Sequence, residues 1–164
     1  MRTKYIAFFL VLFLISLSLF GCSSDPVRQD LYNYAYKELP KITALYSKIE
    51  REYESVSGEN YTDDKTISNA IKNVIVPQSL SLIDAAKAIV LTTEEVKAVH
   101  EKLITVINTQ NSALNILLSA HETQDYDKIA LANEKLETAK KYMSDYIADV
   151  YALGKSHKVK LKKD

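Results

Sequence analysis

Cys22 is the only cysteine in this chain of 164 residues, and it directly follows a long apolar run near the amino terminus. A lone thiol cannot form a disulfide within the chain, and it cannot supply a thiolate cluster for zinc. The chemistry left to this residue is covalent modification of its own sulfur. The residues in front of it, Leu19-Phe20-Gly21, therefore decide which modification is expected.

The leader in front of Cys22 has the three zones of an export signal. Arg2 and Lys4 give it a positive start, residues 6–20 form an uncharged and mainly apolar stretch of 15 residues, and Gly21 is the small residue before the expected cut. A helix that spans a bilayer needs about 20 apolar residues. The polar residues that follow Cys22 end the run early, so we expect the leader, residues 1–21, to be removed.

The stretch Leu19-Phe20-Gly21-Cys22 resembles the lipobox of bacterial lipoproteins, although Phe20 stands where that family usually has a small or β-branched residue. The resemblance implies that Cys22 becomes the first mature residue and carries a diacylglyceryl group. Two acyl chains anchor a protein stably to a membrane. The expected location is the extracytoplasmic face of the cell membrane, with residues 22–25 as a short tether.

The mature chain is also similar, more loosely, to small helical surface lipoproteins of Gram-positive bacteria. The similarity lies in residues 54–64, 93–96 and 132–136. It implies a surface protein outside the cytoplasm and supplies no functional residues.

Low glycine and proline contents predict an all-α fold, because β folds need many turn residues. Apolar spacing indicates four helices, over about 26–57, 62–89, 92–120 and 125–154, the third opened by a capping box from Thr92 to Glu95. Gly58 and Gly154 suit the carboxyl ends of the first and last helices. Short connections favour an antiparallel up-down-up-down four-helix bundle over residues 26–154.

Two prolines fall inside predicted helices. Pro40 should kink or split the first helix, because proline lacks the backbone donor and clashes with the preceding turn. Pro77 follows the β-branched run Val74-Ile75-Val76, so either a kink or a short strand-like interruption is expected there.

Residues 155–164 form a basic tail with five lysines and one aspartate: Lys155, Lys158, Lys160, Lys162, Lys163 and Asp164. In an antiparallel bundle with four helices the last helix ends where the first begins, which brings this tail to the anchored end. The lysines are then candidates for contact with anionic lipid headgroups. A frayed, solvated terminus is the alternative.

Six tyrosines begin the first predicted helix or end the last: Tyr32, Tyr34, Tyr36, Tyr142, Tyr146 and Tyr151. Their rings are candidates either for packing between these helices or for a surface that a partner contacts. Successive helical residues are 100° apart, so the first three rings cannot all point inward. At least one should be exposed.

The remaining chemistry-bearing residues form no catalytic constellation. His100 and His121 would lie about 31 Å apart on one helix, and no Glu-x-x-His pair is present. The carboxylates near Glu50 and Asp63 lack the regular ligand loop of a calcium site. Gln110 falls in an apolar register, where its amide could fix helix pairing or line a small polar pocket. We predict no enzyme activity, catalytic residue, metal, cofactor or nucleic-acid partner.

These observations lead to one expectation and two alternatives. The expectation is a membrane-anchored, non-enzymatic binding or scaffolding module for another protein of the cell envelope. The alternatives are a protective factor that excludes phage or neutralises a toxin at the membrane, and a small-ligand sensor that uses a pocket of the bundle.

Overall fold

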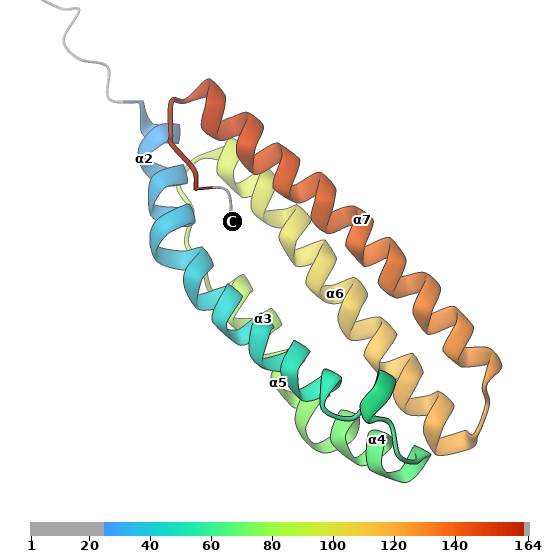
Figure 1. Ribbon diagram of the computed structural model, residues 1–164. Coiled ribbons are helices and arrows are strands. Elements are labelled where there is room, and N and C mark those ends of the chain that lie inside the picture. Colours follow the sequence, from blue (N-terminus) through green and yellow to red (C-terminus); the bar gives the residue numbers. More distant parts are fainter. Residues whose placement is uncertain (1–24, 163–164) are drawn as a thin grey trace, which may run out of the picture.

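A computed structural model describes residues 25–162 of the chain. The predictions for Leu19, Phe20, Gly21, Cys22 and Lys163 lie outside the described residues. Within residues 25–162 the chain has four helical segments and no strand, which confirms the all-α prediction (Figure 1).

The first segment comprises α2 (Pro26–Asn33), the π-helix η2 (Tyr34–Glu38) and α3 (Leu39–Glu54). After a short 3₁₀ turn, η3 (Gly58–Asn60), the second segment comprises α4 (Asp64–Ala70), the π-helix η4 (Ile71–Ile75) and α5 (Val76–Lys87). The third and fourth segments are the long helices α6 (Glu94–Thr123) and α7 (Asp127–Ser156), which lie side by side in Figure 1.

Both prolines are accommodated in the same way. Each follows a five-residue π-helix that ends two positions before it, η2 before Pro40 and η4 before Pro77. In a regular α-helix the proline ring would strike the carbonyl four residues earlier, which belongs to Tyr36 or to Asn73. The wider π turn falls where that carbonyl lies, and π-bulges are a known cause of helix bends. The helix is therefore continuous through Pro40, and the strand-like interruption considered for Pro77 does not occur.

Three clusters of buried side chains fill the space between the helices. The central cluster takes residues from α3, α5, α6 and α7: Ile42, Leu82, Ile83, Ala86, Val99, Leu103, Ile107, Tyr146 and Val150. A second cluster joins α4 and η4 to the second half of α6 and the first half of α7. The third joins α2 to the start of α6 and to Val159 beyond the end of α7. Burying such aliphatic side chains contributes about 1.5–3 kcal/mol each.

Two helix starts are capped by an aspartate that directly precedes the helix, and a third is not. Asp25 caps α2 by accepting from the amide of Arg28 at 3.0 Å, and Asp63 caps α4 by accepting from Thr66 at 2.9 Å. The capping box at Thr92 is wrong: α6 begins at Glu94, and its N-cap Thr93 makes no side-chain bond to the helix.

The start of α6 is held instead by Asp30 of α2. This carboxylate is buried, and its Oδ2 accepts hydrogen bonds from the Thr92 amide, the Thr93 amide and the Thr93 hydroxyl at 2.9, 2.8 and 2.7 Å. Burial raises the pKa of Asp30, but these hydrogen bonds outweigh that effect and leave the pKa below its ordinary value. An ionised side chain 62 residues away therefore replaces the predicted local cap.

The expected boundary at Gly154 is also wrong. Helix α7 passes through Gly154 and ends at Ser156, and the left-handed residue beyond it is Lys158, with φ of 57°. The Val159 amide then donates to the carbonyl of Gly154 at 2.8 Å, which closes a Schellman-type helix end. Glycine is needed here for close approach, because a Cβ on residue 154 would lie 2.7 Å from Leu161 Cδ1. Gly58 does have a left-handed φ of 58°, but four residues beyond the end of α3.

Residues 157–162 consequently pack on the helices instead of fraying. His157 Nδ1 lies 2.8 Å from Asp25 Oδ2 in an ion pair, Val159 is buried, and Leu161 contacts the central cluster. The side chains of Lys155, Lys158, Lys160 and Lys162 remain exposed. The start of α2 and the segment after α7 therefore lie at the same end of the molecule.

Candidate functional site

A groove of about 980 Å³ runs between α3 and α7, with α6 as its floor. Leu103 and Ile107 of α6 line the bottom. The wall on the α3 side is formed by η2 and α3, mainly with small or partly apolar residues, and the α7 wall carries larger ones. The first wall has Ala35 and Tyr36 of η2 and Leu39, Pro40, Ile42, Thr43, Ala44, Tyr46 and Ser47 of α3, and these face Met143, Tyr146, Ile147, Val150 and Tyr151 of α7. Leu161 and Lys162 close one end. The groove exists because α3 packs against α5 and η4, which leaves its other side open.

The walls are exposed to solvent and yet carry no charge. On α3, Pro40, Thr43 and Ala44 are exposed, and on α7 the side chain of Ile147 is 44% exposed. Of the residues that line the groove only Lys162 is charged, in a chain where 26% of residues are charged. A contiguous uncharged band on exposed helices marks a surface suited to a partner or ligand.

The tyrosine hydroxyls of the groove are already engaged within the protein. Tyr36 donates to the carbonyl of Lys160, and Tyr151 donates to that of Lys162 at 2.7 Å. Tyr46 accepts a hydrogen bond from the Gln110 side chain, which ties α3 to α6. These tyrosines thus offer mainly ring surface to an occupant, because each hydroxyl already has one partner within the protein. The Tyr46 bond agrees with the expectation that Gln110 fixes helix pairing.

Beneath the groove the fourth tyrosine of its lining, Tyr146, belongs to a buried polar chain. Tyr146 Oη lies 3.0 Å from Tyr34 Oη, Tyr34 Oη lies 3.2 Å from His100 Nδ1, and His100 Nε2 lies 3.0 Å from the carbonyl oxygen of Ala86. The carbonyl can only accept, so a neutral His100 carries its proton on Nε2. Nδ1 must then accept from Tyr34, and Tyr34 in turn accepts from Tyr146.

Burial keeps every member of this chain neutral. It lowers the pKa of His100, raises the pKa of Tyr34 far above its usual value, and raises the pKa of Tyr146 to about 12. A fully satisfied chain of neutral groups holds the helices in one arrangement and offers no proton donor or acceptor to a substrate. It fixes the orientation of Tyr146 in the α7 wall of the groove.

The six tyrosines expected at a partner surface divide into two groups. Tyr34 and Tyr146 are buried, with 0% and 5% exposure, so the expectation of a partner surface is wrong for these two and the packing alternative holds. Tyr32, Tyr36 and Tyr142 are exposed, as the 100° argument required for at least one ring, and Tyr151 is partly exposed. Sequence reasoning missed the uncharged wall residues of α3 and Ile147 of α7. The pattern that could have identified them is a run of helix-surface positions without charged side chains.

Charges are unevenly placed along the groove. At the end near α2 lie Lys162 and the other exposed lysines that follow Gly154. Beyond Ser47, the same side of α3 continues with the exposed Glu50 and Glu54, at steps of three and four residues. Partial burial, and next the charge of Glu54, raise the pKa of Glu50. The ion pairs within residues 25–162 include neither glutamate.

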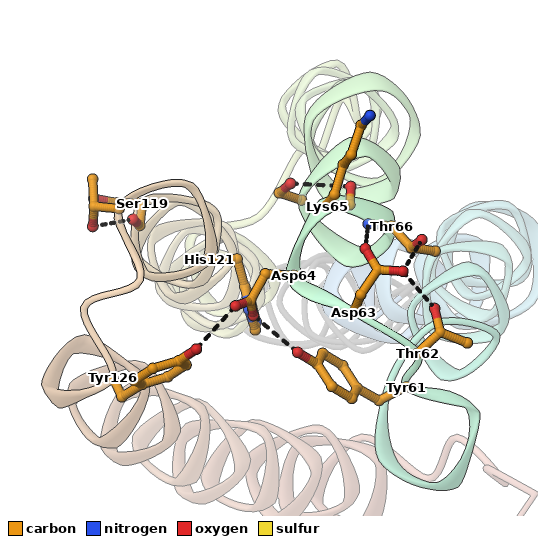
Figure 2. A network of polar contacts seen from close by, with 11 residues as sticks. Tyr61, Thr62, Asp63, Asp64, Lys65, Thr66, Ser119, His121 and Tyr126 are labelled. Carbon is orange, nitrogen blue, oxygen red and sulfur yellow. Dashed lines mark hydrogen bonds and ion pairs between the residues drawn. The ribbon is translucent and has the colours of Figure 1, made fainter.

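A second polar cluster lies at the opposite end of the molecule from Asp25 (Figure 2). Asp64 Oδ1 accepts from Tyr61 at 3.0 Å and lies 2.7 Å from His121 Nδ1, and Oδ2 accepts from Tyr126 at 3.0 Å. The hydrogen bond from His121 is the main cause that lowers the pKa of Asp64, against a smaller opposing effect of burial. The carboxylate is fully engaged in joining the start of α4, the end of α6 and the turn before α7, which is a structural role.

Within residues 25–162 no three His, Cys, Asp or Glu side chains are grouped so that they could hold a metal ion. The helices of the same range include none with the length and hydropathy needed to cross a bilayer. Comparison with protein families, curated proteins and solved structures finds no match to this chain. The groove is therefore the feature on which a function can be argued.

Proposed function

We propose that this protein is a lipid-anchored, non-enzymatic binding module of the bacterial cell envelope, and that it holds a partner protein in the groove between α3 and α7. The observation that carries the proposal is an exposed groove with uncharged walls whose tyrosine hydroxyls are engaged internally. Exposed apolar surface is costly in water, and a contiguous apolar patch on a protein surface often marks a binding site.

The helices are proposed to form an antiparallel up-down-up-down bundle. Contacts near both ends support this topology. Asp25, before α2, pairs with His157, after α7, while at the other end Lys72 of η4 pairs with Glu122 of α6 at 2.8 Å. Lys102 of α6 and Asp149 of α7 form an ion pair although they are 47 residues apart, as expected for neighbouring helices of opposite direction.

The anchor is proposed to be a diacylglyceryl group on Cys22. Only Ser23 and Ser24 separate Cys22 from Asp25, and three extended residues span about 10 Å. The His157–Asp25 pair then holds the exposed lysines after Gly154 close to the bilayer, where each contributes about 1 kcal/mol of attraction to anionic lipid. In this arrangement the end of the groove at Lys162 faces the membrane.

A small-ligand binder is a second candidate, because about 980 Å³ lies at the upper end of the range for ligand pockets, roughly 300–1,000 Å³. The partner role fits better, since such pockets enclose most of their ligand and here Pro40, Thr43, Ala44 and Ile147 of the walls are exposed. The protective role would be one form of the partner role, decided by what the partner is.

The test is photo-crosslinking in intact cells from a benzophenone residue at position 147. The matched control is position 131, which lies on the same helix, is similarly exposed at 51%, and is outside the groove. We expect a discrete protein adduct from position 147 and none from position 131, and loss of that adduct when Ala44 is replaced by Glu. Equal adducts from both positions, or none from either, would contradict the proposed binding role. Cys22→Ala should stop acylation and release the protein from the membrane fraction.

A further inference from the structure

The partner of the groove can be described by its shape. The two walls and the floor come from three helical segments, and the uncharged wall on the α3 side runs from Ala35 of η2 to Ser47 of α3. At 1.5 Å per residue those 12 steps span about 18 Å, or three turns of helix. An extended alkyl chain could cover the floor, but it would leave the exposed wall residues Ala44 and Ile147 in contact with water. A helix, at about 10 Å across, offers the walls far more surface than an alkyl chain does.

The direction of such a helix follows from the charges at the groove ends. An α-helix carries a partial positive charge at its amino end and a partial negative charge at its carboxyl end. One end of the groove presents Lys162, and the other continues into the exposed carboxylates Glu50 and Glu54. Partial burial, and next the charge of Glu54, raise the pKa of Glu50. A bound helix gains at both ends if its amino end lies at the glutamates and its carboxyl end at Lys162.

We infer, on the basis of the proposed binding function, that the groove between α3 and α7 binds an amphipathic helix of about three turns from a partner protein. The occupant lies antiparallel to α3, and its carboxyl end points to Lys162. Its inward face is apolar at three- and four-residue spacing and lacks charge, because the tyrosine hydroxyls of the walls are engaged. Its last turn is acidic, since no ion pair within residues 25–162 includes Lys162, and an acidic side chain there would face its ammonium group.

The experiment is a display library of helical peptides of about 14 residues, or four turns. The apolar face is fixed with Leu at heptad spacing, and the polar positions of the first and last turns are randomised. Selection is carried out on the full mature chain with Cys22→Ser, and in parallel on Lys162→Glu. We expect acidic residues to be enriched in the last turn on the first target, and basic residues in the same turn on the second.

Binding of one selected peptide is then measured on three variants. Ile147→Glu should weaken it at least tenfold, which corresponds to about 1.4 kcal/mol, whereas Leu131→Glu on the same helix should leave it unchanged. Circular dichroism checks that both variants are folded. Lys162→Glu should weaken it several-fold, and less at high salt because the charges are exposed.

The possible results separate the two levels of the proposal. If no helix is enriched, but an alkyl probe such as a fluorescent fatty acid binds and is blocked by Ile147→Glu, the helix inference is overturned and the small-ligand role replaces the partner role. If helices are enriched without a charge preference, or with the preference at the wrong end, the orientation is overturned. If cells give the position-147 adduct while the library gives no binder, the helix inference fails and the proposed function stands.

Discussion

Tyr146 of α7 donates its hydroxyl proton to the hydroxyl oxygen of Tyr34, which is 112 residues earlier in the chain and 3.0 Å away. The direction of this bond follows from the carbonyl of Ala86, which fixes the tautomer of His100 and thereby makes Tyr34 a donor to the imidazole. The two tyrosines are therefore not equivalent, since Tyr34 makes two bonds and Tyr146 ends the chain.

Their removal should have unequal effects on stability. Tyr34→Phe leaves both the Nδ1 of His100 and the hydroxyl of Tyr146 buried without a partner, and we expect a loss of about 2–3 kcal/mol. Tyr146→Phe leaves Tyr34 still bound to His100, so about 1 kcal/mol should be lost. Urea unfolding followed by far-UV circular dichroism measures both. Equal losses, or a larger loss for Tyr146→Phe, would mean that the bond directions are wrong.

Stability should also depend on the protonation of His100. Its pKa in the unfolded chain is about 6.5, and burial lowers the pKa in the folded protein. As the pH falls below about 6.5 the unfolded chain takes up the proton first, so the free energy of unfolding falls between that pH and the folded pKa of His100. Above about 6.5 the contribution is fully present.

Comparison with His100→Gln isolates this effect from the other histidines. The variant should be less stable at pH 7.5, and its free energy of unfolding should decline less than that of the wild type between pH 6.5 and 5. The matching spectroscopic measurement is the imidazole titration by NMR, in which His100 should titrate below pH 6.5. A normal or raised pKa at this residue would contradict the buried neutral tautomer.

The carboxylate of Asp30 should stabilise the start of α6 across the fold. Asp30→Ala removes three hydrogen bonds from Thr92 and Thr93, and a cost of about 3 kcal/mol is expected because the two amides lose their acceptor in a partly buried site. Thr93→Val, which removes only one of the three bonds, is the control and should cost about 1 kcal/mol. Hydrogen exchange at residues 92–96 should speed up in the first variant far more than in the second. Unchanged exchange in Asp30→Ala would show that the local sequence alone begins the helix.

Gly154 should hold the segment after α7 against the bundle. Gly154→Val places side-chain atoms where Leu161 lies, so residues 157–162 should detach from the helices more often. Trypsin should then cut after Lys158 and Lys160 about tenfold faster, which corresponds to a free energy of opening lowered by about 1.4 kcal/mol. The control is the double variant Gly154→Ala/Leu161→Ala, in which the nearest clash is removed. Trypsin should cleave it at about the same rate as the single variant Leu161→Ala. The contact has no such role if Gly154→Val and the wild type are cleaved at the same rate.

Much of this fold could be predicted from local sequence patterns, and the exceptions share a cause. Apolar spacing predicted the four helical segments, and the caps that Asp25 and Asp63 form depend on local sequence alone, because their partners lie three residues ahead. The cap on α6 could not be predicted locally, since its acceptor Asp30 comes from another helix. Gly154 suggested a helix end, whereas its function is to admit Leu161, a contact that exists only after the chain folds back.

The candidate site was only partly foreseeable for the same reason. The tyrosines were expected to lie together at one end of the molecule, but spacing could not tell that Tyr34 and Tyr146 bond to each other and that Tyr36 and Tyr151 line a groove. The groove itself arises from α3 packing on α5 instead of closing against α7. That choice depends on the whole set of helix contacts, and no single segment encodes it.

Thiol labelling can test whether a partner occupies the groove in the cell. The single native cysteine, Cys22, is expected to be acylated, so an introduced cysteine would be the only free thiol. Ile147→Cys and Leu131→Cys should react with a membrane-impermeant maleimide at similar rates in the purified Cys22→Ser protein, since the parent side chains are 44% and 51% exposed. In intact cells we predict that the labelling rate at position 147, divided by the rate at position 131, falls about tenfold. A groove that is unoccupied only one tenth of the time would give this ratio. The same ratio of rates in cells and in the purified protein would contradict the account.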